Sequence, residues 1–256
     1  LHNLKKGREN IGKDLLIKIF RLPFIWLNEK SYLKRADLIH VQTQLELNRL
    51  NKMLGSGDNK VVVAPNGIKE ELFDVKYTPQ ERNSILLMTQ MDGSRTESLD
   101  YFLQHVWKPL IKQNDTLTLH LVGKPPSTTK RKDYLESIPG LNIVGFVDEF
   151  KDAFIDKSIS VVPIFQNHGL INRVVDSLCA GIPTVGFTEV MQTVDGLINN
   201  EHALVADNAE EMIQQINFLI TNPNECRRLS ENAKKLMIQK PNWEKTGNII
   251  LNKMTS

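Results

Sequence analysis

The 256-residue sequence predicts an α/β protein built on a doubly wound parallel sheet. Three observations lead to this prediction. Short apolar segments typical of buried strands alternate with segments of helical periodicity throughout the second half of the chain. The strand segments are continuously apolar, as expected where helices cover both faces of a sheet. A helical segment usually separates one strand from the next, and parallel strands need such a crossover.

The first quarter of the chain is organised differently. Residues 1–13 are polar and basic and are expected to form a loop or a frayed helix. Residues 14–35 carry apolar residues at helical spacing, mixed with basic side chains, and Pro23 is expected to kink or break this helix. We expect this second segment to pack on a neighbouring domain; contact with a membrane surface is the alternative. A short buried strand is predicted at residues 36–43 and a helix at residues 44–53.

The next strand, at residues 60–65, ends at the turn dipeptide Asn66-Gly67. The polar residues 68–82 after it are expected to connect two domains. Further strands are predicted at residues 84–89, 116–123, 141–147, 159–162, 184–187 and 201–206. Helices are predicted at residues 98–111, 130–137, 149–156, 170–179, 209–219, 224–239 and 241–254.

Composition narrows the class of protein. Hydrophobic residues make up 41% and charged residues 24% of the chain, and the net charge of +2 is too small for a dedicated nucleic-acid binder. The two cysteines lack the spacing of a metal site, and Cys179 is expected to be a buried thiol in a reducing compartment. The chain starts at Leu1 rather than Met, which suggests a fragment or a processed form.

Several common catalytic motifs are absent from the sequence. No Gly-x-Gly-x-x-Gly follows a strand segment, and Gly123-Lys124 is followed by two prolines instead of a Walker-type Ser or Thr. No Gly-x-Ser-x-Gly elbow and no His-Glu-x-x-His zinc motif occur. These absences argue against a classical dinucleotide enzyme, a P-loop nucleotidase, a serine hydrolase and a zinc protease.

Ligands of doubly wound sheets bind at the carboxyl ends of the strands. Four loops leave those ends in the second half of the chain, at residues 90–97, 123–128, 147–149 and 163–169. They and the helix that follows the last of them bring Arg95, Lys124 and Arg173 to one rim. Three cations on one rim suit a diphosphate, because Arg can bind phosphate oxygens in a bidentate way.

The last of these loops ends at His168-Gly169, and a helix is predicted to begin at Leu170. The free N–H groups of its first turn would attract an anion. Arg173 and Asp176 lie three residues apart on one helix face, where they could serve a diphosphate and sugar hydroxyls. The alternative is an ordinary strand–helix–strand unit with a solvated ion pair. For His168, both a functional and a structural role remain open.

The run from Pro163 to Pro183 resembles the donor-site signature of retaining GT-B glycosyltransferases of the group 1, family 4 type. That signature has a Pro, a Gly-rich loop, a Lys or Arg, and then Glu-Ala-Met-Ala-x-Gly-x-Pro. Further segments resemble the same family in the family's order, namely residues 36–43 (ADLIHVQT), 63–68 (VAPNGI), 121–123 (LVG), 144–147 (VGFV) and Trp243. The resemblance covers roughly residues 30–250.

The resemblance implies a Rossmann-like fold, the C-terminal domain of a GT-B enzyme, with a short remnant of the N-terminal domain. Residues 1–58 would be the tail of the N-terminal acceptor domain, and residues 59–240 the domain that binds the nucleotide-sugar donor. Residues 241–256 would form a closing helix that returns toward the first domain. Because a GT-B active site lies between two domains, the chain would be the donor half of an enzyme.

The resemblance also implies roles for individual residues. Arg173 takes the place of a phosphate-binding Lys or Arg, and Asp176 that of a Glu that grips the ribose. His168 takes the place of the first of two glutamates eight residues apart, a catalytic position at which His cannot reproduce the carboxylate charge. The residues expected to bind the donor are Arg95, Gly123, Lys124, Gly169, Leu170, Arg173 and Asp176.

The function implied is transfer of a sugar from a nucleoside diphosphate sugar to a sugar or lipid-linked acceptor, with retention at the anomeric carbon. The family's setting suggests polysaccharide or glycolipid synthesis in the cytoplasm, with peripheral membrane contact through residues 14–35 as the alternative noted above. No Asp-x-Asp pair is present, so neither a metal nor another cofactor is expected. Two alternatives stay open: a catalytically inactive nucleotide-sugar-binding or regulatory module, and a nucleotide-sugar epimerase, for which no acidic pair is identified.

Overall fold

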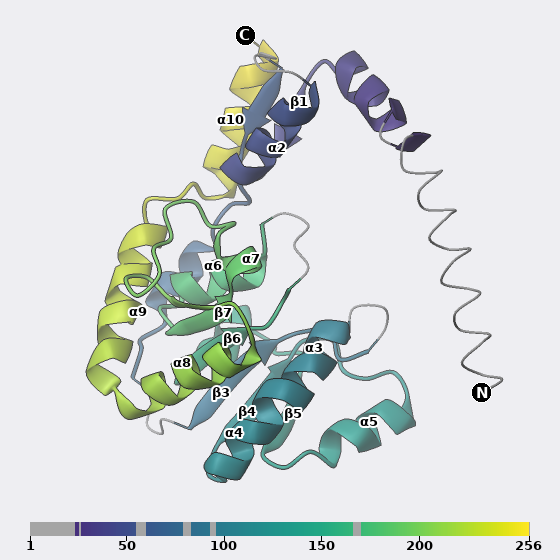
Figure 1. Ribbon diagram of the computed structural model, residues 1–256. Coiled ribbons are helices and arrows are strands. Elements are labelled where there is room, and N and C mark those ends of the chain that lie inside the picture. The colour runs from purple at the N-terminus through teal and green to yellow at the C-terminus, as the bar shows by residue number, and fades with distance from the viewer. Residues whose placement is uncertain are drawn as a thin grey trace, which may run out of the picture.

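The computed structural model (Figure 1) describes residues 24–25, 27–54, 60–78, 83–92, 96–165 and 170–255. Residues 27–35 are helical, in agreement with the periodicity of residues 14–35, whose first part lies outside the described residues. The expectation for residues 1–13 also lies outside them. The described residues form a small upper unit and a larger sheet domain below it in the view of Figure 1.

The upper unit contains two parallel strands, β1 (Ile39–Val41) and β2 (Val61–Val63), joined by α2 (Gln44–Leu54). A capping box starts α2: the Thr43 hydroxyl accepts a 3.1 Å hydrogen bond from the Glu46 N–H, and the Glu46 carboxylate accepts one from the Thr43 N–H at 3.2 Å. The C-terminal helix α10 (Trp243–Thr255) lies beside β2. The predicted strands and helices of this unit are confirmed.

Below this unit, the sheet domain contains six parallel strands in the order β5-β4-β3-β6-β7-β8. Their bounds are β3 (Ser84–Met88), β4 (Thr118–Val122), β5 (Leu141–Gly145), β6 (Ile159–Val162), β7 (Thr184–Phe187) and β8 (Leu204–Ala206). The order runs outward in both directions from the β3–β6 pair, so the switch point of the topology lies between these two strands. The predicted doubly wound parallel sheet is confirmed.

Two hydrophobic cores cover the two faces of this sheet. Alternate side chains of β3 separate them, since Ile85 and Leu87 join one core while Leu86 and Met88 join the other. Helices on the first face are α3 (Glu97–Phe102), α4 (Lys108–Gln113), α5 (Thr129–Glu136) and α8 (Ala209–Thr221). Elements on the second face are the 3₁₀ helices η1 (Glu70–Asp74) and η3 (Phe150–Phe154), with α6 (Asn172–Cys179) and α7 (Thr188–Met191). Helix α9 (Pro223–Met237) contributes to both cores.

The helix predicted at residues 98–111 has an irregular centre. A π-helical turn, η2 (Leu103–Trp107), joins α3 to α4 just before Pro109. Proline has no N–H and its ring crowds the carbonyl four residues earlier, so a widened turn at this point accommodates it. The Trp107 indole N–H donates to the Pro139 carbonyl at 2.9 Å and fixes this wide turn against the start of β5.

Candidate functional site

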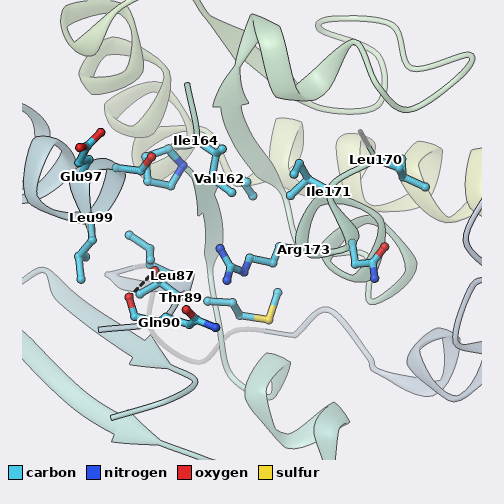
Figure 2. A pocket seen from close by; sticks show the side chains of 14 residues that line it. Leu87, Thr89, Gln90, Glu97, Leu99, Val162, Ile164, Leu170, Ile171 and Arg173 are labelled. Carbon is cyan, nitrogen blue, oxygen red and sulfur yellow. Dashed lines mark hydrogen bonds between the residues drawn. The ribbon is translucent and has the colours of Figure 1, made fainter. Parts of the chain in front are cut away.

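A cavity of about 580 Å³ opens at the switch point of the sheet, at the carboxyl ends of β3 and β6 (Figure 2). Its walls come from the ends of these two strands, the first turn of α3 and the segment that enters α6. The described residues that line it are Leu87, Met88, Thr89, Gln90, Glu97, Ser98, Leu99, Val162, Pro163, Ile164, Leu170, Ile171, Asn172 and Arg173. The cavity lies where doubly wound sheets bind their ligands.

Helix α6 begins at Asn172, two residues later than predicted. Leu170 and Ile171 precede the helix, and their side chains pack against the second core. Ile171 has an extended backbone, with φ −95° and ψ 103°. The first backbone N–H groups of the helix are therefore those of Asn172 and Arg173.

Two of the predicted donor-binding residues, Leu170 and Arg173, line the cavity. Arg173 extends from α6 toward the side of the cavity formed by Thr89 and Gln90 (Figure 2). The Thr89 hydroxyl donates to the Gln90 carbonyl at 3.1 Å, which holds the end of β3 in a tight bend. A cation and the first N–H groups of a helix thus share one cavity, an arrangement that suits an anionic ligand.

Gly123 and Lys124 follow β4 and are not among the described residues that line the cavity. Gly123 has φ +132°, and a Cβ there would lie 2.2 Å from the Thr89 carbonyl oxygen, so only glycine allows the two strand ends to approach this closely. Lys124 is exposed, and its carbonyl accepts a 3.1 Å hydrogen bond from the Met91 N–H. These contacts join the loops after β3 and β4 into one wall beside the cavity.

The carboxylate of Asp92 strengthens that wall. It accepts a hydrogen bond from the Ser127 N–H, and hydrogen bonds with Ser127 lower the pKa of Asp92, with a smaller contribution from the charge of Lys124. From α5, the Arg131 guanidinium donates through Nε to the Met91 carbonyl at 2.8 Å and pairs with Asp100 on α3 at 2.7 Å. The loop after β3 is therefore held from two sides.

Asp176 lies one turn further along α6, is only 6% exposed, and is not among the described residues that line the cavity. Its two carboxylate oxygens are each 3.3 Å from the Lys69 ammonium. Burial raises the pKa of Asp176, and the charge of Lys69 opposes that rise. The alternative of a solvated ion pair on α6 is therefore wrong for Asp176, because its carboxylate is buried and pairs with a residue from another element.

Lys69 was not predicted as part of the site. It lies two positions after Gly67, and its separation of 107 positions from Asp176 leaves no local pattern that could have linked the two. A second long-range contact, a hydrogen bond between side-chain amides, joins Asn66 to Asn172 at 2.8 Å. The signal available in the sequence was the turn itself, which marks the crossing between two units.

Three predicted site residues, Arg95, His168 and Gly169, lie outside the described residues, so their roles stay predictions. Across the described ranges, no group of three His, Cys, Asp or Glu side chains is arranged to hold a metal ion. In the same ranges, no helix combines the length and the apolar character needed to cross a membrane.

Comparisons with solved structures show the same fold in several proteins. TarM has a TM-score of 0.70 and 16% identity, over 90% of this chain and 46% of TarM. Sucrose-phosphate synthase from Thermosynechococcus elongatus has a TM-score of 0.69 and 19% identity, over 89% of this chain and 60% of the synthase. HepE from Anabaena, solved with UDP and glucose, has a TM-score of 0.67 and 13% identity, over 86% of this chain and 63% of HepE.

This chain thus spans between about half and two thirds of the length of these proteins. No curated protein gives a significant sequence match. The family model described as "Glycosyl transferases group 1" matches residues 82–222, which include β3 to β8, the cavity and α6. Since that match covers more than half of the sequence, the chain belongs to the group 1 glycosyltransferases, and its Rossmann-like fold matches that of the GT-B enzymes.

Proposed function

We propose that this chain is the donor half of a glycosyltransferase that binds a nucleoside diphosphate sugar and transfers the sugar to an acceptor. The observation that carries the proposal is the cavity at the switch point, where Arg173 and the start of α6 meet the ends of β3 and β6. Its volume of about 580 Å³ falls within the range of small-molecule sites.

The chemistry required of such a site is stabilisation of a diphosphate as it leaves. Arg173 would hold two phosphate oxygens through its planar guanidinium, and the N–H groups of Asn172 and Arg173 would add the positive end of the α6 dipole. Groups fixed in advance around the developing charge lower the barrier to departure because they need no reorganisation. The outgoing charge is then met by side chains and backbone of this chain.

The remaining predicted residues complete the proposal. Asp176 would accept hydrogen bonds from the ribose hydroxyls, one turn of α6 away from the diphosphate. The loop with Gly123 and Lys124 would border the donor, and Arg95 and Gly169 would contact it. His168 would stand at the catalytic position beside the sugar.

The printed complexes of two neighbours guide the choice of nucleotide. HepE was solved with UDP and glucose, and a TarM mutant from S. aureus was solved with UDP. Both support UDP as the first nucleotide to test. Retention at the anomeric carbon and catalysis without a metal or another cofactor remain part of the proposal and derive from the family resemblance.

The proposed domain limits follow from the same reasoning. Residues 59–240 would bind the donor, residues 241–256 would close the domain, and residues 1–58 would end an acceptor domain. The acceptor, a sugar or a lipid-linked sugar, would be bound mainly by that other domain. Polysaccharide or glycolipid synthesis in the cytoplasm is the proposed setting, with peripheral contact at the inner face of the membrane as the alternative.

Isothermal titration of UDP into the wild-type chain and the Arg173→Ala variant tests the proposal. Loss of a charged hydrogen-bonding partner costs about 1.5–3 kcal/mol, so we expect the dissociation constant to rise by roughly 10- to 100-fold. Arg228→Ala is the matched control, since Arg228 lies on α9 and pairs with Glu225 at 2.6 Å. Equal UDP affinity in the wild-type and Arg173→Ala chains would overturn the proposal.

The second candidate is a nucleotide-sugar-binding module without catalysis. It is favoured by the residue types at two positions: where the resemblance places two glutamates, this chain has His168 and the shorter Asp176. Incubation of the full-length protein with UDP-glucose separates the two candidates. A transferase releases UDP by transfer or slow hydrolysis, whereas a binding module with the same UDP affinity releases none.

A further inference from the structure

The segment that connects β2 to η1 lies along one face of α6. Two residues of this segment, Asn66 and Lys69, contact Asn172 and Asp176, which are four positions apart and thus share a helix face. Asn66 donates to the Asn172 side-chain oxygen at 2.8 Å, and the Lys69 ammonium lies 3.3 Å from each Asp176 oxygen. The connecting segment therefore reaches the part of α6 that carries the proposed ribose ligand.

The Lys69 ammonium is held in place by a third contact. It lies 3.5 Å from the centroid of the Phe150 ring, at the start of η3, in the geometry of a cation–π interaction. The Lys69 side chain is 34% exposed and that of Asp176 is 9% exposed. Lys69 thus has one side open to solvent or ligand, while its charge is directed at a buried carboxylate.

The charged and titratable groups around Asp176 come from four elements. Lys69 and Glu71 belong to the connecting segment and η1, Cys179 lies one turn further along α6, and Lys234 on α9 interacts with Cys179. Glu71 acts against Lys69 by raising the pKa of Asp176. The Lys69 ammonium is in direct contact with the Asp176 carboxylate. We therefore expect its charge to affect the protonation of Asp176 more than the charges of the more distant groups do.

We propose that Lys69 is a positioning residue for nucleotide binding, which orients the Asp176 carboxylate and keeps it available to the ribose hydroxyls. The inference rests on the proposed function, because it assigns Asp176 to the ribose. An ionised carboxylate offers about four acceptor positions, so contact with one ammonium leaves positions for two hydroxyl donors. Stability alone gives little reason for the pair, since buried ion pairs are often no more stable than apolar replacements.

The test measures UDP affinity by isothermal titration at pH 8 and pH 6. In Lys69→Gln, burial still raises the pKa of Asp176, but no neighbouring cation opposes that rise. Asp176 then takes up a proton more readily as the pH falls from 8 to 6, so the ratio of the UDP affinity at pH 8 to that at pH 6 should be several times the wild-type ratio. UDP itself titrates between pH 6 and pH 8, but this changes the affinity ratio of both proteins by the same factor. Comparing the two ratios therefore isolates the effect of the substitution.

Three matched variants complete the design. Lys69→Arg keeps the charge and should restore the wild-type ratio, whereas Glu71→Gln removes a charge that raises the pKa and should not increase the ratio. In the double variant Lys69→Gln with Asp176→Asn, the extra pH dependence should vanish because the titrating group is gone. If Lys69→Gln has the same ratio of UDP affinities at pH 8 and pH 6 as the wild-type chain, the inference is overturned.

A measurement on the wild-type chain decides the matter if Lys69→Gln does not fold. The ¹³C carboxyl resonance of Asp176, assigned with Asp176→Asn, should move on saturation with UDP at pH 6 and 8. A resonance that does not move also overturns the inference. Failure of the proposed function looks different: the wild-type chain would then not bind UDP, or Arg173→Ala would bind it with unchanged affinity.

Discussion

The side-chain amides of Asn66 and Asn172 are joined by a 2.8 Å hydrogen bond across 106 positions of sequence. Gln42, directly after β1, donates to the Asn66 oxygen at 2.9 Å. The two hydrogen bonds link the upper unit, through the connecting segment, to the first residue of α6. Because Asn172 lines the cavity, these hydrogen bonds connect the upper unit to one wall of the proposed donor site.

We expect Asn66→Ala and Asn172→Ala each to lower the free energy of unfolding by about 0.5–1.5 kcal/mol, the usual net value of a hydrogen bond. Urea denaturation of the two single variants and the double variant measures the coupling. A coupling near 0.5 kcal/mol or more would show that the two amides act together. Additive losses would mean that the bond contributes nothing to stability.

Substitution by alanine is expected to change stability in opposite directions at Gly67 and Gly247. A Cβ on Gly67 would lie 2.2 Å from the Trp243 backbone nitrogen, whereas a Cβ on Gly247 has no neighbour within 4 Å. We expect Gly67→Ala to destabilise the protein by about 1–3 kcal/mol, because the start of α10 must move. Gly247→Ala should stabilise α10 by up to about 1 kcal/mol. Thermal denaturation followed by circular dichroism checks both, and equal melting temperatures would contradict the Gly67 contact.

The lowered pKa of His120 predicts that the folded protein loses stability in mild acid. Burial, with a contribution from Lys157, lowers the pKa of His120 from 6.5 to about 4, and its Nδ1 lies 3.2 Å from the Asn142 amide nitrogen. Between these two pKa values the unfolded chain binds more protons than the folded one, so stability falls as the pH falls from about 6.5 to about 4. Allowing for partial exposure, we expect a loss of about 1–2 kcal/mol. Urea denaturation at pH 7 and pH 4.5 measures the free energy of unfolding at each pH. The decrease between the two should be smaller by this amount in His120→Gln than in the wild-type chain.

Cys179 should resist alkylation in the folded protein. It is fully buried, and burial raises the pKa of its thiol to about 12. Because the thiolate is the reactive form, we expect labelling by iodoacetamide at pH 8 to be at least about 100-fold slower than after unfolding in urea. Mass spectrometry of digested protein distinguishes Cys179 from Cys226, which is also buried. Rapid labelling of Cys179 under native conditions would contradict its burial.

The sequence predicted best where burial alone decides the structure. Strands β6 and β7 are buried at every position, and their bounds agree with the prediction to the residue. A continuous apolar run between turn residues has few other solutions in a covered parallel sheet. Helix α7 was missed because its four residues are too short to show a helical period.

The start of α6 shows how a local pattern can mislead. The sequence predicted a helix from Leu170, directly after His168-Gly169. In the structure, Leu170 and Ile171 precede the helix and pack against the second core, and Ile171 has an extended backbone. The partners of Asp176 and Asn172 could not be predicted either, because both come from a segment more than 100 positions away and no periodicity encodes such contacts.

The chain passes between its upper unit and its sheet domain twice, and the two passages lie side by side. The Ile68 N–H donates to the Pro241 carbonyl at 3.0 Å, and the Thr246 hydroxyl donates to the Pro65 carbonyl at 2.9 Å. A single linker would leave the two parts free to swivel in any direction. Two adjacent backbone segments that are hydrogen-bonded to each other restrict the directions in which one part can rotate relative to the other. We therefore expect the upper unit to move relative to the proposed donor cavity in fewer directions than a single linker would allow.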